Sequence, residues 1–250
     1  MKKKHFIPTL ISVIIISLTN FPILAQDLSV DAGADFVSRY IWRGLNVNEQ
    51  PNVQPYISLQ YKGLQLGFWG SCGLSGLNSD DENYMFSSEI DTWLSYSFTL
   101  NNSINVTALV TDYYFPNQGI RIGNFNNYDD EDGPGAHTIE AGLTIAGTES
   151  FPLSLSGYIN IYNDEGNNAY LQADYSTILH DLEIDFFSGA ALGSKETPEY
   201  YGTQKFNFIN VGIKVLKSVA ITDSFSLPVY CSYILNPKKG IAFLVLGISI

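Results

Sequence analysis

Ten charged residues recur at positions where a β-strand would turn them to one face, and together they could select ions. A strand alternates its side chains between two faces, so residues two or four positions apart share a face. The set contains eight acids and two bases. A ring of carboxylates around a water-filled lumen favours cations over anions. The candidate lumen-lining residues are Asp31, Asp35, Arg39, Glu89, Asp91, Glu140, Asp174, Glu183, Asp185 and Lys214.

Two acidic runs, residues 80–82 and 129–132, offer oxygen ligands of the kind that Ca²⁺ prefers. The spacing of an EF-hand loop fails for the second run. With Gly133 in the sixth position, Tyr128 would be the first ligand and Ile139 the twelfth. We therefore expect solvated loop charge and no metal site.

Enzymatic chemistry would have to use His137 or His180, the histidines that lie beyond the N-terminal segment. A lipid hydrolase facing the bilayer needs a Ser-His pair, but hydroxyl residues are so frequent here that a nearby one carries no information. His180 stands beside Asp181 in a predicted turn, where such residues are ordinary. Gly-rich phosphate loops, metal-ligand spacings and redox motifs are absent from the sequence. We expect no enzymatic activity and no cofactor.

Strands are the elements that would position the charged set, because apolar and polar residues alternate over about ten residues at a time. Ile90, Leu94 and Phe98 share one face of such a run. In a later run, alternation places Ile209 on the apolar face and Phe208 on the polar face. The runs predict twelve strands, at 28–41, 52–61, 64–73, 85–100, 103–115, 136–147, 152–163, 169–179, 182–192, 206–222, 225–235 and 241–250.

Short and long connections alternate between these strands. The short ones are residues 62–63, 101–102, 180–181 and 223–224, and the long ones are 43–51, 74–84, 116–135 and 193–205. Short periplasmic turns and long external loops are typical of bacterial outer-membrane barrels. We predict an all-β fold, a transmembrane antiparallel up-and-down barrel of about twelve strands, with both termini on the periplasmic side. The loop 116–135 could fold into its mouth as a constriction.

A soluble sandwich or lipocalin-like barrel is the alternative fold. Soluble strands have about 5–6 residues, whereas tilted membrane strands need about 9–11, and most predicted runs have the greater length. Aromatic residues gather near strand ends, which predicts two interfacial girdles. They are Tyr40, Trp42, Phe68, Trp69, Tyr113, Tyr114 and Phe115 toward the long loops, and Tyr61, Phe98, Phe151 and Phe225 toward the short turns.

Residues 1–25 predict a cleaved signal peptide, with three lysines at 2–4, an apolar stretch, and Ala25 before the cut. Its removal lowers Lys+Arg from 13 to 10, leaves Asp+Glu at 25, and moves the net charge from −12 to −15. Such acidity argues against nucleic acid as a partner. We expect residues 26–250 to form the barrel domain, located in the cell outer membrane.

The composition supports contact with lipid, because charged residues make up 15% of the chain against about 25% in average soluble domains. Cys72 and Cys231 fall on the third and eleventh predicted strands, which are not neighbours. We therefore expect two separate thiols.

Residues 34–45 (ADFVSRYIWRGL) and 50–55 (QPNVQP) are similar to the opening strand and first loop of the TorF-type porins. Residues 67–71 (GFWGS) resemble the third strand of that family, and 225–230 (FSLPVY) with Asn236 and Pro237 resemble the closing hairpin of related envelope proteins. The resemblance extends weakly over the whole mature chain and is specific only around Arg43 and Gly44. The resemblance implies an outer-membrane barrel that acts as a porin, with no catalytic motif.

These observations lead to one main functional prediction and two alternatives. The prediction is a narrow, cation-preferring pore in outer-membrane lipid that passes small solutes. The first alternative is a surface structural or adhesion barrel whose lumen is plugged, since twelve strands lie between about eight, which fill, and about 16–18, which stay open. The second is a lipid-modifying outer-membrane enzyme.

Overall fold

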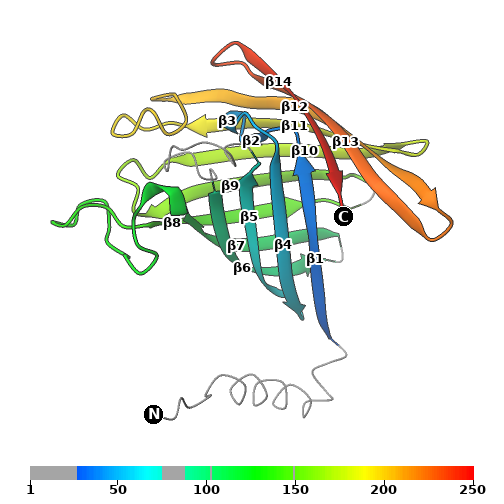
Figure 1. Cartoon of the computed structure of the whole chain (residues 1–250), viewed down its shortest axis with the longest axis horizontal. Helices are drawn as coiled ribbons and strands as arrows, with labels where there is room; N and C mark the ends of the chain where they lie inside the picture. Colours follow the sequence, from blue (N-terminus) through cyan, green and yellow to red (C-terminus); the bar gives the residue numbers. More distant parts are fainter. Residues whose placement is uncertain (1–26, 75–87, 102, 149) are drawn as a thin grey trace, which may run out of the picture.

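The structure, a computed structural model, describes residues 27–74, 88–101, 103–148 and 150–250, which contain one closed antiparallel barrel (Figure 1). Each barrel strand pairs with its neighbours along the chain, and the last pairs with the first. In the described ranges, no helix is long and apolar enough to cross a membrane. The barrel strands are β1 (Leu28–Val37), β4 (Asn52–Tyr61), β5 (Leu64–Gly73), β6 (Ser88–Leu100), β7 (Ile104–Tyr114), β8 (His137–Ala146), β9 (Leu153–Tyr162), β10 (Ala169–Leu179), β11 (Leu182–Leu192), β12 (Phe206–Thr222), β13 (Phe225–Asn236) and β14 (Ile241–Ser249).

The predicted all-β class, the twelve strands and the up-and-down order are confirmed. Strands β4, β5, β10, β11 and β12 have the predicted bounds. The predicted signal peptide, residues 1–25, and the acidic run 80–82 lie outside the described residues.

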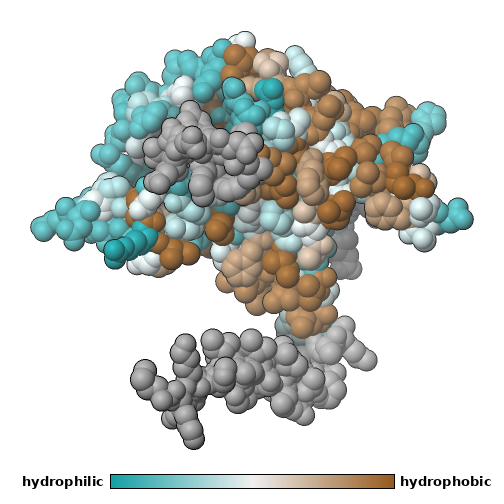
Figure 2. Space-filling model, in the orientation of Figure 1, coloured by the Kyte–Doolittle hydropathy of each residue, from teal (hydrophilic) through white to brown (hydrophobic). Residues whose placement is uncertain are grey.

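Apolar side chains cover the outside of the wall and polar ones face the lumen. In β6, the side chain of Leu94 is 50% exposed, whereas its neighbour Ser95 is 6% exposed. In β4, Ile57 is 47% exposed and Ser58 only 4%. Figure 2 shows apolar residues over the strands and hydrophilic residues gathered at the loops. This distribution is the reverse of a soluble barrel, which keeps its apolar residues inside.

The short connections at residues 62–63, 180–181 and 223–224 are tight turns at the end of the barrel where β1 begins and β14 ends, and residue 102 of the fourth connection lies outside the described residues. Lys62 and Gly63 have φ values of +47° and +84°, which suit the type I′ hairpin turn. His180 has φ +60°, so it serves as a turn residue, as the sequence predicted.

Alternation predicts the wrong faces for two residues of β12. Phe208 is 51% exposed and Ile209 is fully buried, the opposite of the expectation. The register between β11 and β12 shifts between Gly189 and Ala190. Such a bulge places an extra residue on one strand and reverses the faces beyond it. Ile209 and Asn210, which is 7% exposed, are therefore both buried inside the wall.

The first strand ends earlier than predicted, at Val37, and the chain then forms a separate hairpin. Its strands are β2 (Tyr40–Trp42) and β3 (Leu45–Asn48), which pair with each other in a sheet of their own. The predicted range 28–41 therefore joined two elements. The polar connection expected at 43–51 is part of this hairpin.

The barrel closes through a short ladder. Strand β1 pairs with β4 along its whole length, from Leu28 opposite Tyr61 to Val37 opposite Asn52. With β14 it pairs only from Asp35 to Val37. The seam between β1 and β14 is thus the shortest ladder of the wall.

Cys72 on β5 and Cys231 on β13 are both free thiols. Their strands are not neighbours in the barrel order. The prediction of two separate thiols is confirmed.

Candidate functional site

The β2–β3 hairpin leaves the wall after β1 and crosses the lumen. Its turn residues, Arg43 and Gly44, have φ values of +48° and +76°, a conformation that favours glycine in a type I′ turn. A Cβ on Gly44 would lie 1.8 Å from the carbonyl oxygen of Ile209 in β12. The side-chain amide of Asn236 in β13 donates a 3.0 Å hydrogen bond to the Gly44 carbonyl oxygen. The tip of the hairpin therefore rests against the wall formed by β12 and β13.

Arg43 joins the hairpin to a second part of the wall. Its guanidinium donates two hydrogen bonds to the Glu140 carboxylate in β8, with N–O distances of 2.6 and 2.8 Å. It donates a third, of 2.7 Å, to the Tyr201 hydroxyl. The Tyr113 hydroxyl in β7 donates to the same carboxylate at 2.9 Å. The Arg43 and Glu140 side chains are 10% and 2% exposed, so water has little access to this ion pair.

Aromatic rings surround the Arg43 guanidinium. Its carbon lies 4.6 Å from the ring centre of Trp42, 4.5 Å from that of Tyr158 and 4.6 Å from that of Tyr170. These are distances at which a cation is attracted to the face of a ring. Burial alone would lower the pKa of Arg43, but Tyr201 and Glu140 outweigh it and hold the pKa well above its usual range. Arg43 is therefore a permanent cation inside the lumen.

Three predicted lumen acids lie near the hairpin. Glu140, 1% exposed, is the partner of Arg43, and Glu89 on β6 is 6% exposed. Asp91 follows on the same face of β6, and its Oδ1 atom is buried with no hydrogen-bond partner among the described residues. Burial first, then the charges of Glu89 and Asp91, raise the pKa of Tyr40 on the hairpin. The Tyr40 hydroxyl thus stays protonated and can donate to a carboxylate.

Three more predicted acids accept hydrogen bonds from polar side chains of neighbouring positions, which holds them against the wall. Asp35 accepts from Ser249 at 2.5 Å, Asp174 from Gln172 at 2.7 Å, and Asp185 from Ser176 at 2.6 Å.

The four remaining predicted residues lie elsewhere. Arg39 and Lys214 line one inner cavity of about 210 Å³, and the Lys214 ammonium lies 4.2 Å from the ring centre of Tyr230. Asp31 and Glu183 are exposed, toward the end with short turns. The ten residues are therefore spread over different levels of the barrel and do not form a single ring.

The girdle predicted near the long loops is wrong for four aromatic residues. Tyr40 and Tyr113 are each 8% exposed, and Tyr40 packs on Trp69 with 5.5 Å between ring centres. Trp42 packs between Tyr113 and Tyr201 inside the lumen. Tyr113 and Trp69 occupy inward positions of their strands, and the hairpin carries Tyr40 and Trp42 into the lumen. Phe68, which is 47% exposed, does face outward.

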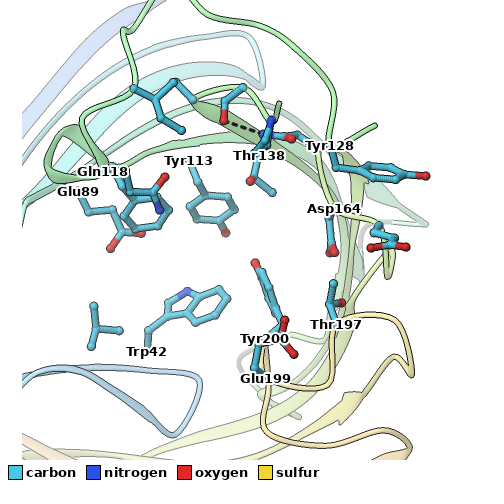
Figure 3. A pocket seen from close by; sticks show the side chains of 18 of the residues that line it. Trp42, Glu89, Tyr113, Gln118, Tyr128, Thr138, Asp164, Thr197, Glu199 and Tyr200 are labelled. Atoms are coloured by element: carbon cyan, nitrogen blue, oxygen red, sulfur yellow. Dashed lines mark hydrogen bonds between the residues drawn. The ribbon is translucent and has the colours of Figure 1, made fainter. Parts of the chain in front are cut away.

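A cavity of about 460 Å³ lies at the loop end of the barrel, beside the hairpin (Figure 3). Trp42 and Tyr200 lie on one side of it and Tyr113 and Thr138 on the other, with Glu89 and Asp164 at opposite ends. Burial raises the pKa of Tyr200 to about 12, so its hydroxyl remains a donor at neutral pH. Loop residues between 116 and 136 also line the cavity. The long loop and the hairpin therefore line this cavity together.

His137 holds the long loop against the outer wall. Its Nδ1 lies 2.9 Å from the Asp112 carboxylate, and its Nε2 lies 2.7 Å from the Ile122 carbonyl oxygen. The Phe125 ring stacks on the imidazole with 4.1 Å between centres. Both ring nitrogens therefore face acceptors, and the histidine has a structural role in fastening the loop.

The residues that sequence reasoning missed are Arg43, Tyr201 and Trp42 as parts of the lumen. Arg43 and Gly44 belong to the segment of the porin resemblance, but they were placed in an external loop. A signal was available, because an X-Gly pair between alternating residues is typical of a hairpin turn. The inward direction of the hairpin had no such signal.

Comparison with known proteins assigns no family to the chain. No protein-family model matches it, and no curated protein matches it. The resemblance to TorF-type porins therefore rests on the residue patterns given above.

Proposed function

We propose that this chain is an outer-membrane barrel that passes small solutes, with the β2–β3 hairpin as the gate of its lumen. The observation that carries the proposal is the bidentate contact between Arg43 and Glu140, which joins the hairpin to the opposite wall. The pore prediction and the resemblance to TorF-type porins agree with this function. We infer that this conformation is the closed state of the gate.

The outer face supports a location in lipid. Ile57, Leu94 and Leu171 are 47%, 50% and 46% exposed, and they belong to β4, β6 and β10, in different parts of the ring. Contiguous apolar surface of this extent is rare on soluble monomers. A closed barrel is a structure that can span a membrane, because its backbone groups pair between neighbouring strands. The predicted signal peptide adds an export route.

The pairing of the hairpin supports a moving gate. Strands β2 and β3 pair only with each other among the described residues, in a sheet separate from the barrel. Moving the hairpin therefore breaks no hydrogen bond of the barrel ladders. It breaks side-chain contacts, among them the Arg43–Glu140 pair, whose separation would leave buried charges without partners.

The inner charges support a preference for cations. Glu140 neutralises Arg43, and the other seven predicted lumen acids outnumber the two predicted lumen bases, Arg39 and Lys214. Carboxylates in a lumen raise the local concentration of cations and repel anions. Under a salt gradient, the reversal potential of the open channel should therefore be shifted toward the Nernst potential of the cation.

The experiment is to record currents through planar bilayers containing the purified barrel with and without its hairpin. Val37 and Asn52 are direct neighbours in the β1–β4 ladder, so an Asn-Gly turn can replace residues 38–51. We expect rare, small openings from the wild type and a steady, cation-preferring conductance from the variant. Migration on gels before and after boiling checks that both barrels are folded.

A second candidate, the structural barrel with a plugged lumen, is favoured by the burial of the Arg43–Glu140 pair. A folded variant without the hairpin that conducts no ions would refute the channel and support this candidate. A mature chain that stays monomeric in water without detergent would refute both.

A further inference from the structure

We propose that the cavity at the loop end of the barrel is a binding site for a small organic cation, an alkylammonium or arylalkylammonium ion. The cavity measures about 460 Å³, within the range of small-molecule sites. The proposal does not require the hairpin to move, so it stands or falls separately from the gated channel.

The charges around the cavity have one sign. Its charged lining residues are Glu89, Asp164, Glu165 and Glu199, and no lysine, arginine or histidine lines it in the described part of the chain. Asp164 is already saturated, because the side-chain amides of Asn160 and Asn168 donate to it along with backbone N–H groups of its own loop. Glu89, Glu165 and Glu199 are therefore the carboxylates that can face a ligand.

Glu89 is the main anchor because it is buried without a cation. Its side chain belongs to a residue that is 6% exposed, and none of the ion pairs of the described residues includes it. Its hydrogen-bond neighbour is the neutral Tyr40 hydroxyl. A buried carboxylate without a counter-charge is driven toward its neutral form, and a cation bound beside Glu89 would stabilise the ionised form and gain a charged partner.

Aromatic walls make the site suited to an organic cation. Trp42, Tyr113 and Tyr200 surround the space in Figure 3, and Tyr128, which is 43% exposed, stands at its rim. Rings attract cations through their negatively charged faces, most strongly where water is excluded. Arg43 is held by the same means nearby. A metal ion is a poorer fit, because the described residues contain no group of three acidic, histidine or cysteine ligands suited to one.

The test is calorimetric titration of the folded barrel in detergent with three cations: tetramethylammonium, choline and phenethylammonium. The matched control for choline is 3,3-dimethylbutan-1-ol, which has the same shape without the charge. We expect at least one cation to bind at millimolar concentration or below, and the neutral alcohol to bind at least tenfold more weakly. If none of the three cations binds better than the alcohol, the proposal is refuted.

Variants locate the site. Glu89→Gln keeps the side-chain shape and removes the charge, and we expect at least tenfold weaker cation binding. Tyr128→Leu should weaken binding by about threefold, as expected for one partly exposed ring. Glu131→Gln removes an equal charge from an exposed loop position outside the cavity and should leave the affinity within twofold. Equal losses of cation affinity in Glu89→Gln and Glu131→Gln would refute the proposed site. They would mean that the cation is attracted by the total negative charge at the mouth of the barrel and not by Glu89.

A folding check keeps these results interpretable. Migration on gels before and after boiling reports whether each variant is folded. If Glu89→Gln does not fold, Glu199→Gln takes its place, because Glu199 is exposed on a loop. An unchanged cation affinity in both Glu199→Gln and Tyr128→Leu would then refute the proposal.

Discussion

Replacing Arg43 by alanine should open the lumen. The substitution leaves the Glu140 carboxylate, 2% exposed, without its cation. Breaking a buried ion pair by removing one partner costs about 3–5 kcal/mol. Loss of three guanidinium–ring contacts near 4.6 Å adds about 0.5–1 kcal/mol each. Since about 1.4 kcal/mol is tenfold in an equilibrium constant, the closed state should lose at least about a hundredfold in relative population.

The assay is single-channel recording of the Arg43→Ala variant beside the wild type. We expect longer and more frequent openings, and faster proteolysis at the hairpin in detergent. Arg121→Ala is the matched control, because it removes the same charge from an exposed position of the long loop. It should behave like the wild type.

A double variant separates the ion pair from general damage to the hairpin. Replacing Arg43 by methionine and Glu140 by glutamine together removes both charges and leaves no isolated one. Removal of both partners is commonly far less destabilising than removal of one, so the double variant should open less often than Arg43→Ala. The reasoning would be refuted if the open probability of Arg43→Ala equalled that of the wild type, or if the double variant opened as often as Arg43→Ala.

The remaining predictions concern other contacts. Gly44→Ala should open the lumen, because its Cβ would lie 1.8 Å from a carbonyl oxygen of the wall, whereas Gly240→Ala, also at positive φ but in open space, should leave the conductance unchanged. His137→Ala should release the long loop at a local cost of about 1–3 kcal/mol for the buried partners left unpaired, seen as faster proteolysis within residues 116–136; an unchanged cleavage rate would contradict the fastening role. Cys72 and Cys231 should both react with a maleimide after unfolding in the absence of reductant, and a requirement for reductant would disprove two free thiols.

The alternation of apolar and polar residues along each strand was enough to predict most of the fold. A residue on a strand faces in or out by parity alone, and exposed Leu94 beside buried Ser95 follows that rule without further information. Turn chemistry located the tight connections, as at Lys62 and Gly63. The rule failed at Ile209, because the bulge formed there depends on the register between β11 and β12, which cannot be read from one strand alone.

The candidate site was less accessible to sequence reasoning. Glu140 was identified as an inward acid, but its partner Arg43 lies 97 positions away in the chain, on a segment interpreted as an external loop. Trp42 and Tyr113 were recognised as aromatic residues near strand ends and assigned to a lipid interface. Nothing local distinguishes an interfacial ring from one that packs around a buried guanidinium.

The sequence by itself determined the strand order, the two faces of the wall and the excess of acids inside it, because each depends on spacing along one strand or across one turn. The tertiary structure alone decided that the hairpin crosses the lumen. That outcome depends on contacts among Arg43, Glu140 and Tyr201, whose strands and loops become neighbours only when the ring closes. A buried ion pair is stable only with both partners in place, so its existence could not be inferred from either one.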